Sequence, residues 1–234
     1  MRMSGNTVVI TGGASGIGYA MAKYFHARDN TVLICGRRED RLAQVAAELP
    51  GLQTLRCDVT DPADRQALAD FVGTHLKGVN VLVNNAGIQR DIDLTQGLPE
   101  LTRGESEIAV NLEAPIALSL LFTSLLAGKP GATIVHVSSG LAFMVERASR
   151  APVYCATKAG IHAFSIAQRI QLAPLGIKVV EIIPPGVESE LNPESRSKRD
   201  LTNASWMMKA DDFVDKALAQ LEQDVEEIRV SPNH

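Results

Sequence analysis

The stretch Thr11-Gly12-Gly13-Ala14-Ser15-Gly16-Ile17-Gly18 stands between the apolar run Thr7–Ile10 and a segment of helical periodicity. This order predicts a strand, a tight glycine-rich turn and the first turn of a helix. Glycines let a backbone approach a ligand closely, and the free N–H groups at a helix N-terminus attract negative charge. The stretch therefore predicts a cradle for the pyrophosphate of a dinucleotide. A turn that only closes an ordinary βα unit is the alternative interpretation.

The composition is that of an ordinary globular protein. The chain has 234 residues, of which 45% are hydrophobic and 21% charged, and its formal net charge is −4. No proline- or serine-rich linker divides it, so we expect a single domain over residues 1–234. The mildly acidic balance gives no reason to expect nucleic acid as a partner. We find no apolar run of the roughly 18 to 20 residues that span a bilayer and no signal peptide, and we expect a cytoplasmic protein without a membrane segment.

Cysteines and histidines are scattered along the chain. Cys35, Cys57 and Cys155 are odd in number and widely spaced, which predicts reduced thiols. The five histidines form no pair at i and i+4, so we expect no metal site.

Seven short apolar runs alternate with segments of helical periodicity. They are Thr7–Ile10, Thr31–Cys35, Gln53–Cys57, Val81–Asn84, Thr133–Ser138, Ile177–Ile183 and Glu227–Val230. Continuous Val, Ile and Leu runs are typical of strands that helices cover on both faces. The pattern predicts an α/β fold of the Rossmann type, with a doubly wound parallel sheet of about seven strands and helices on both faces. Asp61-Pro62 predicts a helix start, and Pro50-Gly51 predicts a helix end.

The stretch Leu191–Asn203 is polar, charged and aperiodic, which predicts a loop. It follows the carboxyl end of a predicted strand, the edge at which open α/β sheets bind ligands. We therefore expect a substrate loop over residues 188–208, either as a lid or as a solvated surface segment.

A tyrosine and a lysine lie on one face of another predicted helix. Tyr154 and Lys158 are spaced i and i+4. A tyrosine hydroxyl ionises at a pKa of about 10, and a neighbouring ammonium lowers that value, so the pair predicts a usable acid/base. Ser138-Ser139 ends the preceding strand, where a hydroxyl can reach a bound carbonyl. A surface tyrosine beside a lysine is the alternative for the pair alone.

With these motifs the chain resembles the compact, single-domain short-chain dehydrogenases/reductases over essentially its whole length. The resemblance rests on the glycine turn, on Asn84-Asn85-Ala86-Gly87, on the asparagine of Val110-Asn111-Leu112, and on the serine, tyrosine and lysine just described. It implies a catalytic set of Asn111, Ser139, Tyr154 and Lys158. Tyr154 follows Ser139 by 15 positions, slightly more than is common in the family, which leaves Ser138 as the alternative serine.

The resemblance also implies a role for each member of this set. Tyr154 would exchange a proton with the substrate oxygen while hydride passes to or from the nicotinamide, and Ser139 would hold that oxygen. Lys158 would lower the tyrosine pKa and bind the nicotinamide ribose. Asn111 would position the water that relays the proton.

A larger set of positions matches the family's cofactor-binding residues. The implied set is Gly12, Ser15, Gly16, Ile17, Gly18, Arg37, Arg38, Asp58, Val59, Asn85, Ala86, Gly87, Tyr154, Lys158, Pro184, Val187 and Ser189. Asp58-Val59 matches the pair beside the adenine. The last three positions assume that Pro184 matches the proline of the family's Pro-Gly element, and a register through Pro185-Gly186 is the alternative.

The end of the second predicted strand bears on cofactor choice. It reads Cys35-Gly36-Arg37-Arg38. An acidic residue there would bind the adenine ribose 2′-hydroxyl and repel a 2′-phosphate. Because Gly36 stands at that position and Arg37 offers a guanidinium, we expect NADP(H), with NAD(H) as the alternative. Arginines that only pair with Glu39 and Asp40 are the other interpretation.

These interpretations predict an NADP(H)-dependent oxidoreductase that acts on a small carbonyl or alcohol substrate, which the sequence does not identify. A non-catalytic NADP(H)-binding sensor or regulatory protein on the same fold is the alternative. A sugar-nucleotide epimerase or dehydratase fits less well, since its Gly-x-x-Gly-x-x-Gly pattern is not found here. By resemblance we also expect a homodimer or homotetramer, paired through helices at about 102–127 and 153–173.

Overall fold

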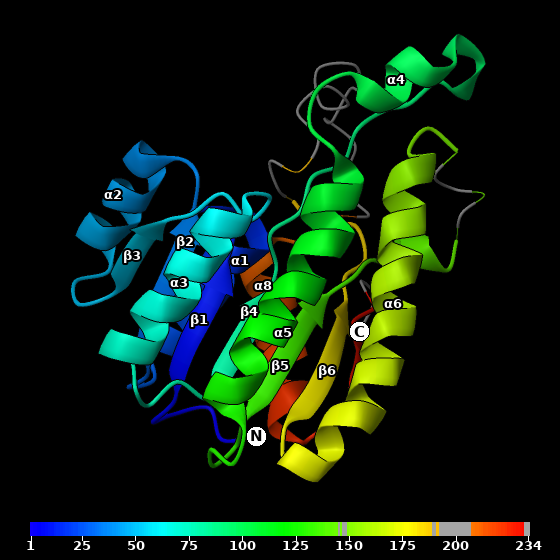
Figure 1. The fold of residues 1–234 in the computed structure, drawn as a ribbon. Coiled ribbons are helices and arrows are strands. Elements are labelled where there is room, and N and C mark those ends of the chain that lie inside the picture. The colour runs from blue at the N-terminus through cyan, green and yellow to red at the C-terminus, as the bar shows by residue number, and fades with distance from the viewer. Residues whose placement is uncertain (145, 147–148, 189–190, 192–206, 232–234) are drawn as a thin grey trace.

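A seven-stranded parallel sheet in the order β3-β2-β1-β4-β5-β6-β7 forms the centre of the molecule (Figure 1). The structure is a computed structural model, and it describes residues 1–144, 146, 149–188, 191 and 207–231. The strands are β1 (Thr7–Thr11), β2 (Thr31–Gly36), β3 (Gln53–Arg56), β4 (Val81–Asn84), β5 (Thr133–Val137), β6 (Lys178–Ile183) and β7 (Glu227–Arg229). All neighbours pair in parallel. The predicted doubly wound α/β fold of the Rossmann type is confirmed.

Helices cover both faces of the sheet. They are α1 (Gly16–His26), α2 (Glu39–Glu48), α3 (Pro62–His75), α4 (Leu98–Thr102), α5 (Ala114–Leu126), α6 (Pro152–Leu172) and α8 (Ala210–Glu222). Figure 1 shows α3, α5 and α6 in front of the sheet and α1 and α8 behind it. Successive residues of a strand point to opposite faces, so Val8 and Ile10 belong to the core under α1 and α8 while Val9 belongs to the core under α3 and α5. The predicted apolar runs are therefore buried on both sides.

Two predicted helix boundaries are confirmed. The Asp61 side chain accepts a hydrogen bond of 2.8 Å from the backbone N–H of Ala63, and Pro62 is the first residue of α3. This satisfies one of the N–H groups that a helix start leaves free. Helix α2 ends at Glu48, two residues before Pro50-Gly51.

The predicted helix at about 102–127 begins later than expected. Gly104 has a φ of +72°, which interrupts helical geometry after α4. The chain then forms a π-helical turn, Ala109–Glu113 (η2), which leads directly into α5. Such turns insert an extra residue into a helix and occur often at functional sites.

One stretch corrects the expectation that no apolar run is long enough to cross a membrane. Ala109–Leu126 covers 18 residues with a mean hydropathy of 1.6, which meets the length and composition of a span. Its side chains Leu118 and Phe122 are buried against Leu82 and Ile134 of the sheet, in one apolar cluster. One side of this stretch therefore packs on the sheet, and 44% of its residues are buried.

A row of polar residues crosses the apolar sheet on the face that α5 and α6 cover. The register aligns Asn84 with His136, His136 with Glu181, and Glu181 with Glu227. His136 is fully buried, with Nε2 2.8 Å from Oε1 of Gln168 and Nδ1 3.4 Å from Nδ2 of Asn84. A neutral imidazole satisfies both contacts, as donor at Nε2 and acceptor at Nδ1. Burial lowers the pKa of His136 to about 4.

We expect this histidine to destabilise the fold in acid. Its pKa is 6.5 in the unfolded reference and about 4 in the fold, so between these values the unfolded chain binds the additional proton. The free energy of unfolding should therefore fall by about 3 kcal/mol as the pH drops from about 6.5 to about 4. His136→Gln removes this contribution. Urea unfolding across that pH range should show a flatter pH dependence for the variant and parallel curves above pH 6.5. Equal slopes below pH 6.5 would contradict the assignment.

Candidate active site

The glycine turn after β1 lies unusually close to the chain that follows β4. Gly12 has a φ of +64°, and a Cβ atom there would lie 2.9 Å from Cα of Ala86. A Cβ on Gly18 would overlap the carbonyl oxygen of Gly12 and the side-chain amide of Asn85. Only glycine fits at these two positions, so the turn and the β4 segment form one surface.

Hydrogen bonds join this turn to the Asn-Asn-Ala-Gly segment. The Thr11 hydroxyl accepts bonds of 3.0 Å from the backbone N–H groups of Asn85 and Ala86. The Asn85 side chain donates to the carbonyl oxygens of Thr11 and Gly12, at 2.9 and 3.2 Å. The side chain of Asn85 therefore braces the turn.

The N-terminus of α1 offers unused donors. Ser15 precedes the helix but makes no side-chain cap, so the backbone N–H groups of the first turn remain available. The Ser15 hydroxyl instead accepts a bond of 3.2 Å from Nη2 of Arg38. A hydroxyl, a guanidinium and a helix N-terminus together make a site for a phosphate.

A cavity of about 830 Å³ extends from this turn to the predicted catalytic residues. The predicted residues that line it are Gly12, Ser15, Gly16, Ile17, Arg37, Arg38, Asp58, Val59, Asn85, Ala86, Gly87, Ser139, Tyr154, Lys158, Pro184 and Val187. Gly18 and Asn111 support this wall from behind. Ser189 lies outside the described residues, as does most of the predicted substrate loop 188–208. The cavity is large enough for a dinucleotide and a small substrate.

Part of this wall comes from residues outside the sequence motifs. Arg90, Arg103, Gly104 and Glu105 also line the cavity, from the segment between β4 and α5. Glu105 forms an ion pair with Arg37 across the cavity, and both side chains are about half exposed. Nothing in the local sequence connects two positions so far apart, so only the fold reveals this contact.

Asp58 lies at the adenine side of the site implied by the resemblance. Partial burial opposes its ionisation, but the backbone N–H and the hydroxyl of Thr60 both donate to its Oδ1, at 2.9 and 2.8 Å, and lower the pKa of the carboxyl overall. Its carboxylate is therefore charged and held in place beside the cavity.

Ser139 and Tyr154 meet at the opposite end of the cavity. The Ser139 hydroxyl lies close enough to that of Tyr154 to lower the pKa of the tyrosine, although 15 positions separate the two residues. Ser139 also accepts a bond of 3.2 Å from the backbone N–H of Leu141 and so begins a short 3₁₀ turn, Gly140–Ala142 (η3). Ser138 lines the same cavity, but its buried hydroxyl has no partner among the described residues. The geometry favours Ser139 over the alternative Ser138.

Burial dominates the protonation of the tyrosine and the lysine. It raises the pKa of Tyr154 to about 12, although the nearby Ser139 hydroxyl acts in the opposite direction. Lys158 places Nζ 5.7 Å from the centre of the Tyr154 ring and donates to the carbonyl oxygen of Val137 at 2.8 Å. Burial lowers the pKa of Lys158 to about 8, against the opposing charge of Glu181. The pKa of Tyr154 is thus raised, whereas the Tyr-Lys pair predicts a lowered pKa. Tyr154 therefore keeps its proton at neutral pH.

Asn111 lies in the π-helical turn and is 1% exposed. Its side chain donates to the carbonyl oxygen of Ile88 at 2.8 Å and accepts from the N–H of Ile88 at 2.9 Å. It also donates to the hydroxyl of Thr157 at 3.2 Å, one residue before Lys158. The π turn thus aims Asn111 between the β4 segment and α6, behind the lysine.

Comparison with known proteins identifies the family of this chain. A sequence profile described as short chain dehydrogenase matches residues 6–200. Uncharacterized oxidoreductase DltE of Bacillus subtilis (strain 168) is 44% identical over 97% of this chain and 89% of its own length. Among solved structures, a short-chain dehydrogenase from Sphingobium yanoikuyae in complex with NADPH is 28% identical, with a TM-score of 0.81 over 95% of this chain and 87% of that one. A short chain dehydrogenase from Burkholderia cenocepacia J2315 in complex with NADP is 27% identical, with a TM-score of 0.81 over 100% of both chains. The chain therefore belongs to the short-chain dehydrogenase family of oxidoreductases.

Proposed function

We propose that this protein is an NADP(H)-dependent oxidoreductase that interconverts a small carbonyl compound and its alcohol, with Tyr154 as the general acid and base. The observation that carries the proposal is one continuous cavity with a phosphate cradle at one end and the Ser139–Tyr154 hydroxyl pair at the other. The NADPH and NADP bound to the two similar structures support the choice of cofactor.

The residues present fit such a cofactor. The glycine turn has room for a pyrophosphate that a Cβ on Gly12 would remove, and the first turn of α1 has free N–H groups. When bound, the nicotinamide supplies or accepts the hydride.

The chain's own residues handle the proton and the substrate oxygen. Ser139 holds that oxygen by a hydrogen bond, at the position where Tyr154 can donate its proton during reduction. Because the pKa of Tyr154 is about 12, the proton is present before reduction begins. The ammonium of Lys158, 5.7 Å from the tyrosine ring, stabilises the phenolate that forms. Asn111 holds the β4 segment and α6 together behind this group.

We expect Tyr154→Phe to abolish turnover without loss of cofactor affinity. The phenylalanine keeps the ring but removes the proton donor, which should lower kcat for carbonyl reduction by about 10²- to 10⁴-fold. The rate should be followed as NADPH consumption over a panel of aldehydes and ketones, and affinity as NADPH fluorescence. Tyr24→Phe, the same chemical change outside the cavity, is the control and should keep wild-type rates. A Tyr154→Phe enzyme with most of its kcat would rule out this mechanism. Binding of NADPH without any turnover in the wild type would favour the sensor function instead.

The end of β2 supports NADP(H) over NAD(H). A Cβ at Gly36 meets no atom within 4 Å, and no acidic side chain occupies the position. Arg38 and Ser15 are already joined beside the first turn of α1, and we propose that they bind the 2′-phosphate. Arg37 is held by Glu105, so its planar group is placed to stack on the adenine rather than to act alone on the phosphate.

Gly36→Asp should reverse the cofactor preference. The added carboxylate can bind a ribose 2′-hydroxyl but repels a 2′-phosphate, so we expect Kd for NADPH to rise by more than about tenfold and Kd for NADH to fall. Gly36→Ala is the matched control, because its methyl group enters open space and should leave the preference unchanged. Titrations of wild type and both variants with each cofactor test this. A wild type that prefers NADH would contradict the proposal.

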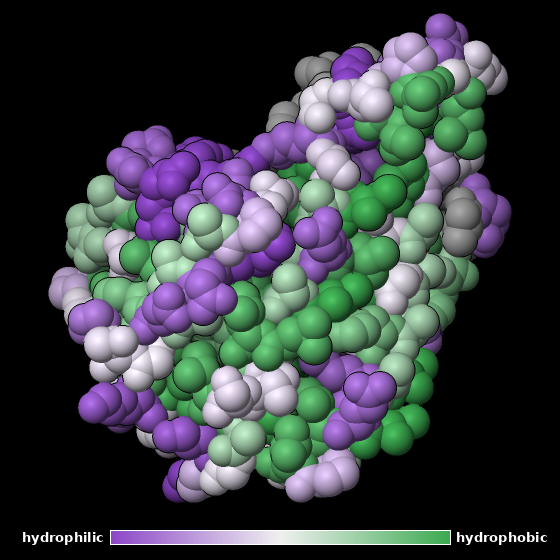
Figure 2. Space-filling view, viewed as in Figure 1, coloured by the Kyte–Doolittle hydropathy of each residue, from purple (hydrophilic) through white to green (hydrophobic). Residues whose placement is uncertain are grey.

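We also propose that the protein pairs with a second copy through α5 and α6. Leu120, Ile166 and Ile170 expose 68%, 42% and 73% of their surface on these two helices. Figure 2 shows apolar side chains gathered over this face. A dimer that buries them gains hydrophobic free energy, so light scattering should give a mass of two or four chains, and Leu120→Lys with Ile170→Lys should give one. A monomeric wild type would refute the pairing.

A further inference from the structure

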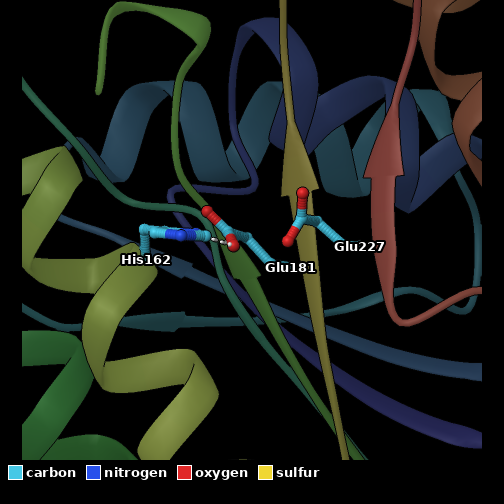
Figure 3. A group of neighbouring side chains, drawn as sticks. All are labelled: His162, Glu181 and Glu227. Atoms are coloured by element: carbon cyan, nitrogen blue, oxygen red, sulfur yellow. Dashed lines mark hydrogen bonds and ion pairs between the residues drawn. The ribbon is translucent and has the colours of Figure 1, made fainter. Parts of the chain in front are cut away.

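Three potential metal ligands lie together on the sheet, outside the cavity described above. His162 comes from α6, Glu181 from β6 and Glu227 from β7, and Figure 3 shows the Glu181 carboxylate between the other two side chains. One ligand atom of each lies within 4.8 Å of the other two. His162 Nδ1 is 2.7 Å from Oε2 of Glu181. None of the three residues lines the cavity.

The two carboxylates are brought together by strand register. Glu181 and Glu227 are paired positions of neighbouring parallel strands, so both side chains point to the face that α6 covers. Like charges at paired positions destabilise a sheet. The pair therefore requires positive charge close by.

Only one of the two carboxylate oxygens of Glu181 has a hydrogen-bond partner among the described residues. Its side chain is 1% exposed, and Oε2 is hydrogen-bonded to His162. The second oxygen, Oε1, is buried without a hydrogen-bond partner in the described part of the chain. A buried carboxylate oxygen without a partner is costly, and a cation between it, the second carboxylate and the imidazole would offset that cost.

Arg229 supplies part of the positive charge but does not complete the cluster. Its Nε and Nη2 donate to Oε1 of Glu227 at 2.9 and 2.7 Å. The same guanidinium stacks over Phe143, 4.3 Å from the ring centre, and that ring lies 4.7 Å from the ring of His162. Arg229 is therefore held at the outer side of Glu227 and leaves Oε1 of Glu181 unpartnered.

We propose that His162, Glu181 and Glu227 form a binding site for one divalent transition-metal ion of the zinc class. Imidazole nitrogen combined with carboxylate oxygen suits Zn²⁺ and its first-row neighbours, whereas Mg²⁺ and Ca²⁺ prefer oxygen ligands alone. Three protein ligands leave a fourth position of a tetrahedron for water.

Ion binding requires the three side chains to shift. Metal–ligand bonds of about 2.0 to 2.2 Å place tetrahedral ligand atoms about 3.3 Å apart, so the His162–Glu181 contact of 2.7 Å has to open by about half an ångström, and separations of up to 4.8 Å in the cluster have to close by up to about 1.5 Å. The side chains of His162 and Glu227 are 24% and 38% exposed, which gives an ion a path from solvent. Once bound, the ion joins α6, β6 and the edge strand β7.

The site can be tested by metal binding to the full-length protein, freed of any purification tag and stripped with a chelator. Titration calorimetry with Zn²⁺ should give one ion per chain, and Co²⁺ should develop visible absorption bands that report nitrogen and oxygen coordination. Zn²⁺ should also raise Tm, since a ligand that binds only the folded state stabilises it. Mg²⁺ should bind at least tenfold more weakly than Zn²⁺.

Two isosteric variants locate the ion. Glu181→Gln and Glu227→Gln should each weaken Zn²⁺ binding by more than about tenfold, because loss of even an outer-shell partner costs about 10- to 100-fold in metal affinity. Glu226→Gln removes the same charge from the neighbouring position and should keep wild-type affinity. Glu227 is the more exposed of the two ligands, so its variant tests the site even if the buried Glu181→Gln does not fold.

Three results would contradict the proposed metal site or its metal class. Less than about one ion per ten chains in the wild type would overturn the proposal, and so would Zn²⁺ binding that persists unchanged in both variants. Equal affinity for Mg²⁺ and Zn²⁺ would overturn the assignment of the metal class. None of these measurements depends on turnover, so the proposed oxidoreductase function stands or falls separately.

Discussion

The close approach of two backbone segments, after β1 and after β4, is the constraint on which the site depends. These strands are neighbours in the sheet although β2 and β3 lie between them in sequence. From β1 the strand order runs outward to β2 and β3 on one side and to β4 and the later strands on the other, so the order reverses between β1 and β4. Open α/β sheets bind ligands in the crevice that such a reversal leaves. Thr11 secures it, since its hydroxyl binds the N–H groups of Asn85 and Ala86 and thereby holds the glycine turn against the other wall. The cavity exists because Gly12 and Gly18 have no side chain to force these walls apart.

The catalytic end of the cavity is built from groups whose burial is costly. Burial raises the pKa of Tyr154 to about 12, which keeps the tyrosine protonated at neutral pH. It lowers the pKa of Lys158 to about 8, which brings the pKa of the lysine closer to neutral pH. Each shift reflects interaction energy that the rest of the fold must offset. The apolar layers around β1 and β4, which are fully buried on both faces, provide that stability.

Much of this architecture follows from local sequence. Runs such as Val8–Ile10 and Ile134–Val137 contain too many branched apolar residues for anything but buried strands, and Asp61-Pro62 marks a helix start by its own chemistry. The positions of Ser139, Tyr154 and Lys158 at one cavity end also follow, because they stand at the carboxyl edge of one strand and on one helix face. The π-helical turn at Asn111 does not follow, since the partners of Asn111 lie in the β4 segment and in α6, far from it in sequence.

Other features could not be predicted from the sequence because they are contacts between distant elements. The ion pair of Arg37 with Glu105 and the cluster of His162 with Glu181 join positions that share no local pattern. The histidines form no short-range pair, so spacing along the chain gives no sign of the cluster around Glu181. In the fold, strand register places Glu227 beside Glu181, and the helix crossing places His162 above them. Register and helix crossing are tertiary properties, which sequence periodicity alone does not determine.

The polar residues under α6 link the cavity to the cluster of His162 with Glu181. Gln168 binds His136, His162 binds Glu181, and Lys158 donates to the carbonyl oxygen of Val137, all from one helix. These partners lie on the sheet or directly after β5, so a rotation of α6 about its axis would break all three contacts together. Apolar packing alone tolerates small rotations, whereas buried hydrogen bonds lose their geometry at once. The helix is thus held in the one orientation that aims Tyr154 and Lys158 into the cavity, and the polar residues far from the cavity contribute to its chemistry by fixing that orientation.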